Sequence, residues 1–190
     1  YSGAAVARYQ ALAHATGRLI AILYWLDTWS PDKLERQIDF MIRNGYSFSY
    51  HSYHEIAEDG RALNVHVSGK SRVNRFDMFA CCWPGCLSVM YDREKIGLIQ
   101  IADIKKNNDT ALWLKVIRKS DCYFLDRDMA AYRRRKGSIT PPTVLQKIRA
   151  HYPLFRHAEG MNPVAASIWT MINVFGNTYK KIFYTRKLSD

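Results

Sequence analysis

An unbroken apolar run over residues 19–26 (LIAILYWL) limits what this chain can fold into more than any other feature of the sequence. The run has the length of a strand. Because polar residues do not alternate with apolar ones, it is typical of a strand covered on both faces, as in a parallel sheet. Residues 4–15 are rich in good helix formers and are followed by Gly17, which predicts a helix before the run. Helices mixed with strands favour layers of the α/β or α+β kind.

Caps, turns and periodicity place the other elements. Ser30-Pro31-Asp32 is typical of a helix start, with a cap, a proline in the first turn and an acid near the positive end of the helix dipole. The residues expected to form the buried face of this helix are Leu34, Ile38, Met41 and Ile42. An aromatic, alternating segment (residues 46–56), a turn at Asp59-Gly60 and residues 62–67 predict a hairpin. The remaining expected elements are helices over residues 76–82, 109–119, 142–159 and 163–184, and strands over residues 86–91, 123–125 and 130–135.

Composition narrows the class of protein and its partners. The 190 residues are 48% hydrophobic and 24% charged, enough for one domain with a real core, or for one domain with a small appendage. A net charge of +11 favours anionic partners, such as nucleic acid, sugar nucleotides or the inner leaflet of a membrane. The basic residues are scattered and no DNA- or RNA-reading motif is present, so we expect no nucleic-acid partner. No stretch reaches the roughly 18 uncharged apolar residues of a membrane-spanning helix.

The four cysteines do not predict a metal or disulfide framework. Cys81, Cys82, Cys86 and Cys122 form no pair of CxxC motifs, and their spacing fits no standard zinc site. The first residues also lack the basic start and apolar run of a signal peptide. We therefore expect reduced cysteines in a cytoplasmic protein.

Four segments together resemble the family-2 glycosyltransferases. Ala7-Arg8 and residues 14–21 (HATGRLIA) are similar to the family signature A-R-N…A-x-G-x-Y-I-A-F-L-D-x-D-D, and residues 29–34 (WSPDKL) to W-x-P-x-K-L-E. Residues 109–114 (DTALWL) resemble (E/Q)-D-Y-x-L-W-L, and residues 132–138 (YRRRKGS) resemble Y-R-x-(H/R)-x-x-S. The segments follow one another in the family's order between about residues 2 and 138. The resemblance is to the bacterial members of the family that build capsular, teichuronic-acid or other cell-envelope polysaccharides.

The resemblance implies an α/β fold of the GT-A type, a mixed sheet flanked by helices. Residues 1–140 would be a partial glycosyltransferase domain without the family's opening nucleotide-binding units, and residues 141–190 a C-terminal helical extension. The implied reaction moves a sugar from a nucleotide-diphosphate donor, a UDP-sugar by expectation, to a polysaccharide or lipid-linked acceptor with inversion. The expected location is the cytoplasm, at the inner face of the membrane.

The resemblance also assigns roles to particular residues. Asp109 would be the catalytic base, because inversion needs a carboxylate that takes the proton of the attacking hydroxyl. The alternative for Asp109 is an ordinary helix cap. Four basic residues would meet the nucleotide and its diphosphate, and two residues would lie in the loop near donor sugar and acceptor. The basic residues are Arg8, Arg133, Arg135 and Lys136, and the loop residues are Trp83 and Cys86. For the basic group, the alternative is a solvated strand end.

The sequence departs from the family where a metal would bind. The family implies Mn²⁺ or Mg²⁺ at its two DxD acids, but Tyr24 and Leu26 stand at those positions and are poor ligands for hard cations. Asp27 is the acid that remains, a weak candidate ligand. Trp25 and Leu26 would instead add apolar surface, which favours a second hypothesis: a degenerate member that acts as a non-catalytic, homo-oligomerising interaction module.

The C-terminal segment carries a separate signal. Residues 168–184 are rich in aromatic and apolar side chains, and basic residues gather at the end of this segment and just beyond it, over residues 180–187. This pattern is typical of a helix that lies on an anionic membrane, and we expect peripheral membrane contact there. The alternative is a core helix with a solvated basic end.

Overall fold

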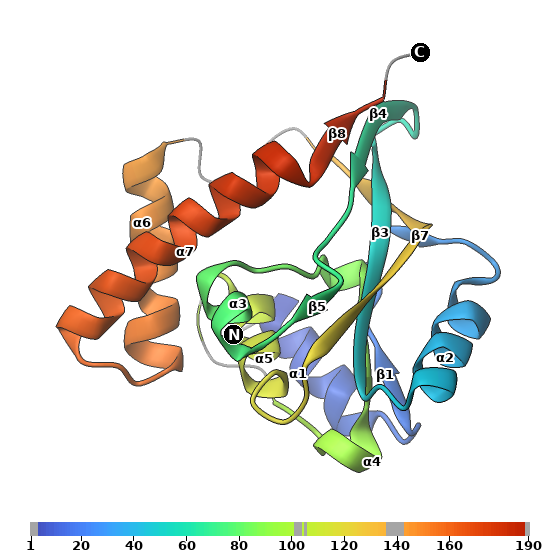
Figure 1. Ribbon diagram of the computed structural model, residues 1–190, viewed down its shortest axis with the longest axis horizontal. Coiled ribbons are helices and arrows are strands. Elements are labelled where there is room, and N and C mark those ends of the chain that lie inside the picture. The colour runs from blue at the N-terminus through green and yellow to red at the C-terminus, as the bar shows by residue number, and fades with distance from the viewer. Residues whose placement is uncertain (1–3, 101–103, 105, 136–142, 189–190) are drawn as a thin grey trace.

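A curled, mixed sheet organises the chain, with α2 on one side and most other helices on the opposite side (Figure 1). The computed structural model describes residues 4–100, 104, 106–135 and 143–188, without the side chains of residues 4–6, 8 and 9. Within this part, the helices are α1 (Ala4–His14), α2 (Lys33–Asn44), α3 (Arg75–Ala80), α4 (Arg93–Ile96), α5 (Asn108–Val116), α6 (Val144–Pro153) and α7 (Pro163–Phe183), with short turns at η1 (Cys86–Ser88) and η2 (Leu154–Ala158). The strands are β1 (Leu19–Ala21), β2 (Thr28–Trp29), β3 (Phe48–Ile56), β4 (Ala62–Val67), β5 (Arg72–Val73), β6 (Met90–Asp92), β7 (Cys122–Arg133) and β8 (Thr185–Lys187).

Strand β3 is the centre of the sheet. It pairs in parallel with β7 and antiparallel with β4 and β6, while β1 lies at the edge beyond β6. Strands β2 and β5 pair with the two ends of β7, and β8 extends the sheet beyond β4. Because β3 and β7 are parallel neighbours, their carboxyl ends meet at one edge of the sheet, the place where α/β proteins commonly build sites.

The apolar run at residues 19–26 is not the doubly covered parallel strand that its pattern predicts. Only Leu19–Ala21 is a strand, and it pairs antiparallel with β6 at the sheet edge. The chain then turns, with the amide of Asp27 donating to the carbonyl of Tyr24 at 3.0 Å, and Trp25 is 87% exposed. The prediction was wrong because the rest of the run, residues 22–26, pairs with no strand in the described part of the chain.

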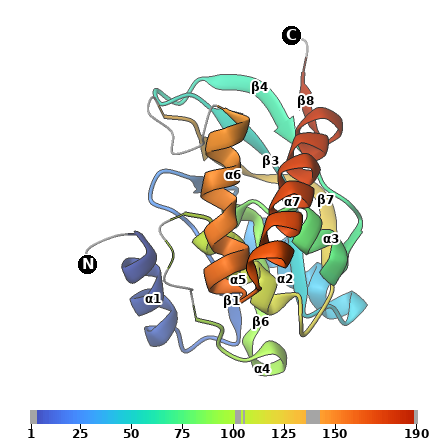
Figure 2. The same ribbon diagram turned by 90° about the vertical axis from the view of Figure 1, so that its left-hand side faces the viewer.

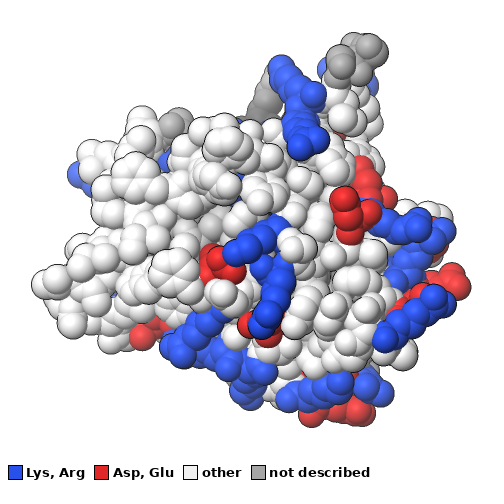
Figure 3. Space-filling view, in the orientation of Figure 1, with Lys and Arg blue, Asp and Glu red and all other residues white. Residues whose placement is uncertain are grey.

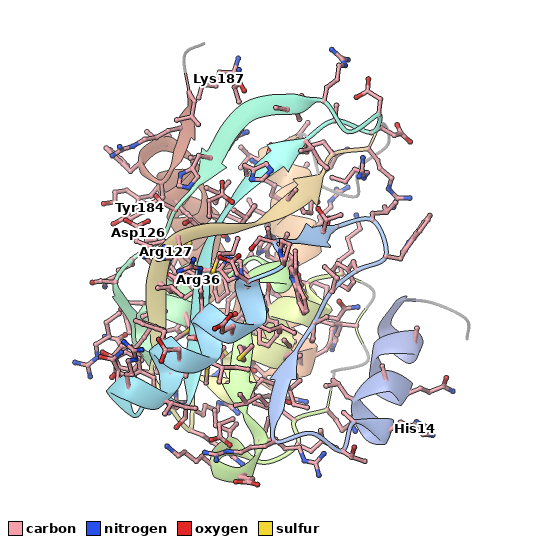
Figure 4. All side chains as sticks on the ribbon, turned by 90° about the vertical axis from the view of Figure 1, so that its right-hand side faces the viewer. His14, Arg36, Asp126, Arg127, Tyr184 and Lys187 are labelled. Carbon is pink, nitrogen blue, oxygen red and sulfur yellow. The ribbon has the colours of Figure 1, made fainter. Side chains whose placement is uncertain are left out.

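Helix α2 forms where its start signal predicts, but it buries a different face. It begins at Lys33 and ends at Gly45, whose φ of 69° is left-handed, as expected for a glycine after a helix. The side chains facing the sheet are Lys33, Gln37 and Met41, whereas Leu34 and Ile42 are exposed. The expected apolar face was therefore wrong for Leu34 and Ile42, whereas Met41 is buried as predicted and Ile38 is partly buried. Figure 4 looks onto this side of the molecule, with Arg36 on α2 and Asp126 and Arg127 on β7.

The core lies on the other side of the sheet, around α5. Trp113, Leu112 and Leu114 are fully buried, and the Trp113 ring lies 6.0 Å from that of Phe48 on β3. Helices α6 and α7 pack in front of this layer (Figure 2). They confirm the two helices expected after residue 140, and the same segment also supplies β8 to the sheet.

Helix α7 approaches α3 closely at Gly176. A Cβ added there would collide with the carbonyl oxygen of Ala80 and lie 2.9 Å from its carbonyl carbon. We expect Gly176→Ala to lower the free energy of unfolding by about 3 kcal/mol, because a backbone carbonyl cannot move aside as a flexible side chain would. Denaturant unfolding measures the change. Ser167→Ala, at an exposed position of the same helix, is the control and should cost little. A Gly176→Ala protein as stable as the wild type would contradict the close approach.

Candidate functional site

Asp109 lies in the first turn of α5, where Asn107 occupies the N-cap position. Asn107 precedes the helix in a left-handed conformation, and its side-chain amide donates to the carbonyl of Ala150 on α6 at 2.8 Å. The Asp109 carboxylate accepts the backbone N–H of Thr110 at 2.8 Å and is partly exposed. Asp109 is therefore not the N-cap residue itself.

The charge of Asp109 reaches groups on three other elements. Burial, with a smaller contribution from Asp109, raises the pKa of Cys82 to about 11. Burial also raises the pKa of Tyr132, at the end of β7, and Asp109 adds to the increase. On α6, burial lowers the pKa of His151, while Asn173 and Asp109 oppose that decrease. The start of α5 thus faces the loop after α3, the end of β7 and α6.

The carboxyl ends of β3 and β7 carry other charged groups that act on Tyr132. Glu55 of β3 is the sheet partner of Tyr132 and takes both N–H groups of the Arg134 fork, each at 2.8 Å. The Tyr53 and Tyr132 rings meet edge to face, with centroids 6.2 Å apart. Glu55 and Asp27 add to the raised pKa of Tyr132, and Arg134 lowers it. Carboxylates from three segments therefore act on one phenol.

Arg133 and Asp27 lie together at the same edge. The backbone N–H of Arg133 donates to the Asp27 carboxylate at 3.0 Å, and its guanidinium donates to the carbonyls of Leu26, Ala57 and Glu58. Asp27 is 7% exposed, and burial raises its pKa against the opposing effect of Arg133. These bonds tie the turn after β1 and the β3–β4 turn to the end of β7.

The other basic candidates are placed less fully. Arg135 is exposed just beyond β7. Lys136 lies outside the described residues, and Arg8 belongs to α1 without a described side chain. The structure therefore brings Arg133 and Asp27 to the edge that Asp109 faces, and leaves the positions of Lys136 and the Arg8 side chain open.

The residues present do not fit the divalent cation that the family implies. Asp27 is nearly buried and already accepts the Arg133 N–H, while Tyr24 and Leu26 occupy the positions of the missing acids. In the described part of the chain, no three His, Cys, Asp or Glu residues are grouped to hold a metal ion. A hard cation needs several oxygen ligands, and this edge does not provide them. The cysteines likewise form neither a metal cluster nor a disulfide.

Trp83 and Cys86, the expected donor and acceptor loop, are both buried. The Trp83 ring packs edge to face on Tyr184, with centroids 4.9 Å apart. The ammonium group of Lys180 donates to the carbonyls of Cys82 and Trp83 at 3.2 and 2.6 Å. The end of α7 therefore holds this loop against the candidate site.

Sequence reasoning missed Tyr53, Glu55, Arg134 and Lys180. The first three become neighbours only through the parallel register of β3 and β7. Local sequence patterns do not predict that register. The separate pocket of about 480 Å³ between α2, β1 and β6 contains none of the predicted site residues. Its lining includes Arg18, Ile42, Tyr46 and Asp92.

Comparison with known proteins identifies the family. No protein-family model matches this chain. TuaG of Bacillus subtilis, named as a teichuronic acid biosynthesis glycosyltransferase, is 34% identical over 181 residues, which cover 95% of this chain and 71% of TuaG. The chain belongs to the glycosyltransferases. This glycosyltransferase chain is also 33% identical over 143 residues to WfgD of Escherichia coli, named a UDP-Glc:alpha-D-GlcNAc-diphosphoundecaprenol beta-1,3-glucosyltransferase, and spans 54% of that protein.

Solved structures agree on the fold of the glycosyltransferase chain. S. aureus TarS in complex with UDP-GlcNAc superimposes with a TM-score of 0.60 at 12% identity, over 88% of this chain and 51% of that one. Another TarS structure gives a TM-score of 0.62 at 10% identity over 96% of this chain and 53% of that one. The expected GT-A-like α/β fold is confirmed, and the chain spans about half the length of these structures.

Proposed function

We propose that the chain transfers a sugar from a nucleotide-diphosphate donor, a UDP-sugar, to a lipid-linked or polysaccharide acceptor with inversion. The observation that carries the proposal is a partly exposed carboxylate, Asp109, in the first turn of α5, close enough to Tyr132 at the end of β7 and to Cys82 for its charge to raise their pKa values. The name of WfgD includes a UDP-sugar donor and a lipid-diphosphate acceptor, and TarS was solved with UDP-GlcNAc. Both support the proposed substrate classes.

In the proposed reaction, Asp109 takes the proton from the acceptor hydroxyl as its oxygen attacks the anomeric carbon. The bond from that carbon to the donor diphosphate breaks on the opposite side, and the diphosphate leaves with the electron pair. Basic side chains stabilise the charge that develops on it. Arg133, Arg135 and Lys136 supply these cations in the proposal, and Arg8 meets the nucleotide.

The proposed location is the cytoplasmic face of a membrane, where a lipid-linked acceptor would be available. A lipid-linked acceptor is supported by the name of WfgD. In the residues that the structure describes, no helix is long and apolar enough to span a bilayer.

A second candidate function is a non-catalytic module that associates with another copy of the chain. The observation that favours it is Trp25, 87% exposed at the turn beside Tyr24 and Leu26, where the family places its acids. An exposed indole next to other apolar residues is a common element of protein contacts. This candidate needs no donor.

Titration with UDP separates the two candidates. We expect UDP to raise the melting temperature, with a stabilisation of about 2.7 kcal/mol at 100 times its dissociation constant. Because the site does not fit a cation, the increase should be the same in EDTA and in Mn²⁺. Differential scanning fluorimetry of the chain, with AMP as the control nucleotide, measures it. Absence of any UDP effect would contradict donor binding and favour the second candidate.

A further inference from the structure

Helix α7 exposes its large apolar side chains and buries small or polar ones, the reverse of what is usual for a helix that packs on a core. Its exposed apolar residues are spaced by three or four, which places them along one stripe of the helix. These residues, here called the α7 stripe, are Val164, Ile168, Met171, Phe175, Tyr179 and Ile182, and each is between 41% and 70% exposed. The buried side chains of α7 are Ala166, Thr170, Asn173 and Val174, mostly small or polar.

The contacts of the buried face prevent the helix from turning its stripe inward. Asn173 donates to the carbonyl of Phe79 at 2.8 Å and lies 2.8 Å from the ring nitrogen of His151. Lys180 is bonded to the loop after α3, and Gly176 lies directly against Ala80. Rotating α7 would leave these polar groups buried without partners, which is costly. The stripe therefore stays on the surface in the folded chain.

The charge around the stripe is one-sided. Residues 163–179 contain no charged side chain, and no acid lies between Glu159 and Asp190. Lys181 lies beside the last residue of the stripe, Arg186 and Lys187 follow it, and all three are exposed. Figure 3 shows the surface over α7 almost without charge, with basic side chains gathered near β8. The surface thus joins an apolar stripe to a basic end.

We propose that the α7 stripe docks on an anionic lipid bilayer, with the helix lying in the plane of the interface and Lys181, Arg186 and Lys187 on the headgroups. Such a helix gains from burying apolar side chains at the acyl boundary and from attraction to anionic lipids. A second copy of the chain fits this surface less well. A parallel pair of stripes brings two basic ends together, and an antiparallel pair sets each basic end against the uncharged start of α7.

The docking surface adjoins the candidate site. Lys180, next to the basic end, holds the carbonyls of Cys82 and Trp83, and the charge of Asp109 acts on Cys82. Docking would therefore present the site to a lipid-linked acceptor in the same membrane. This use of the surface rests on the proposed function, whereas binding to lipid does not.

Vesicle sedimentation tests the proposal. The chain is incubated with vesicles of phosphatidylcholine alone or with phosphatidylglycerol added. We expect binding to the mixed vesicles and little binding to phosphatidylcholine. Phe175→Ser should lower the partition coefficient about tenfold or more, because an exposed phenyl ring is lost from the interface. Lys181→Gln with Lys187→Gln should lower it about fivefold per charge.

Ile42→Ser is the matched control, since Ile42 is equally exposed but lies on α2, on the other side of the sheet. It should bind as the wild type does. Equal binding by Phe175→Ser and wild type, or no binding by a folded wild type, would overturn the proposal. A dimer in sedimentation velocity that Phe175→Ser abolishes would assign the stripe to a second copy instead. UDP titration of the same variants separates the outcomes, because a failed donor site leaves vesicle binding intact.

Discussion

Replacing Asp109 with asparagine is expected to slow sugar transfer by about 10²- to 10⁴-fold, the usual contribution of a general base. Asparagine keeps the size of the side chain and can still accept the Thr110 N–H, but it cannot take a proton at neutral pH. UDP binding should persist, because the proposed donor contacts are Arg8 and the basic residues at and beyond the end of β7, and Asp109 is not among them. The measurement is transfer from a UDP-sugar to a lipid-linked acceptor.

Asp126→Asn provides the control for this prediction. Asp126 is exposed on the middle of β7, away from α5 (Figure 4), and its replacement should leave transfer unchanged. If Asp109→Asn abolished UDP binding instead, the carboxylate would belong to the donor site and the proposed role as base would be wrong. A variant that keeps full transfer would also exclude that role.

Replacing Lys33 with methionine is expected to stabilise the fold by about 3 kcal/mol at pH 6. Lys33 is 0% exposed, and its ammonium group has no hydrogen-bond partner among the described residues. Burial lowers its pKa from the ordinary 10.5 to about 7. This shift corresponds to a destabilisation of the folded, charged state by about 5 kcal/mol. The ammonium lies 3.7 Å from the centre of the Trp29 ring. This cation–π contact offsets about 2 kcal/mol of that destabilisation. Methionine fills a similar volume without the charge.

The stabilisation should depend on pH in a definite direction. The unfolded chain keeps the Lys33 proton up to about pH 10.5, whereas the folded chain loses it near pH 7. The cost of the buried charge is therefore complete below pH 7 and falls as the pH rises from 7 to 10.5. His51, facing Lys33 from β3, has its pKa lowered to about 4 by burial, so it stays neutral throughout this range.

Urea unfolding of wild type and variant between pH 6 and pH 10 measures the effect. The difference in free energy should shrink steadily toward pH 10. Lys181→Met, at an exposed position, should show no such dependence. A Lys33→Met protein that is less stable than the wild type would mean that Lys33 has a favourable partner in solution.

Local chemistry explains the elements that could be predicted from the sequence. The hairpin turn forms at Asp59-Gly60, where Gly60 takes a φ of 92°, and α2 ends at Gly45 for the same conformational reason. Helix α7 begins at Pro163 behind Asn162, whose side chain caps the helix. Such signals act within a few residues, so they survive whatever the rest of the chain does.

Only part of the candidate site could be predicted from the sequence. Asp109 could be proposed because its segment resembles a family motif at a helix start. The Glu55–Arg134 pair could not, because its members are distant in sequence and meet through strand register. The expected pair of short strands after residue 122 is one long strand, β7, because the chain stays extended across an irregularity at which the exposed Asp126 and Arg127 have no partner in β3.

The sequence by itself determined the glycosyltransferase relationship, the positions of most helices and turns, and the excess of positive charge. Only the tertiary structure decided which faces are buried. Lys33 and Asn173 lie inside while Ile42 and Phe175 lie outside, contrary to their hydrophobicity. The reason is that burial depends on partners far along the chain. Asn173 is held by the carbonyl of Phe79 in α3 and Lys180 by carbonyls of the loop after α3, and these contacts orient α7 against its own apolar pattern.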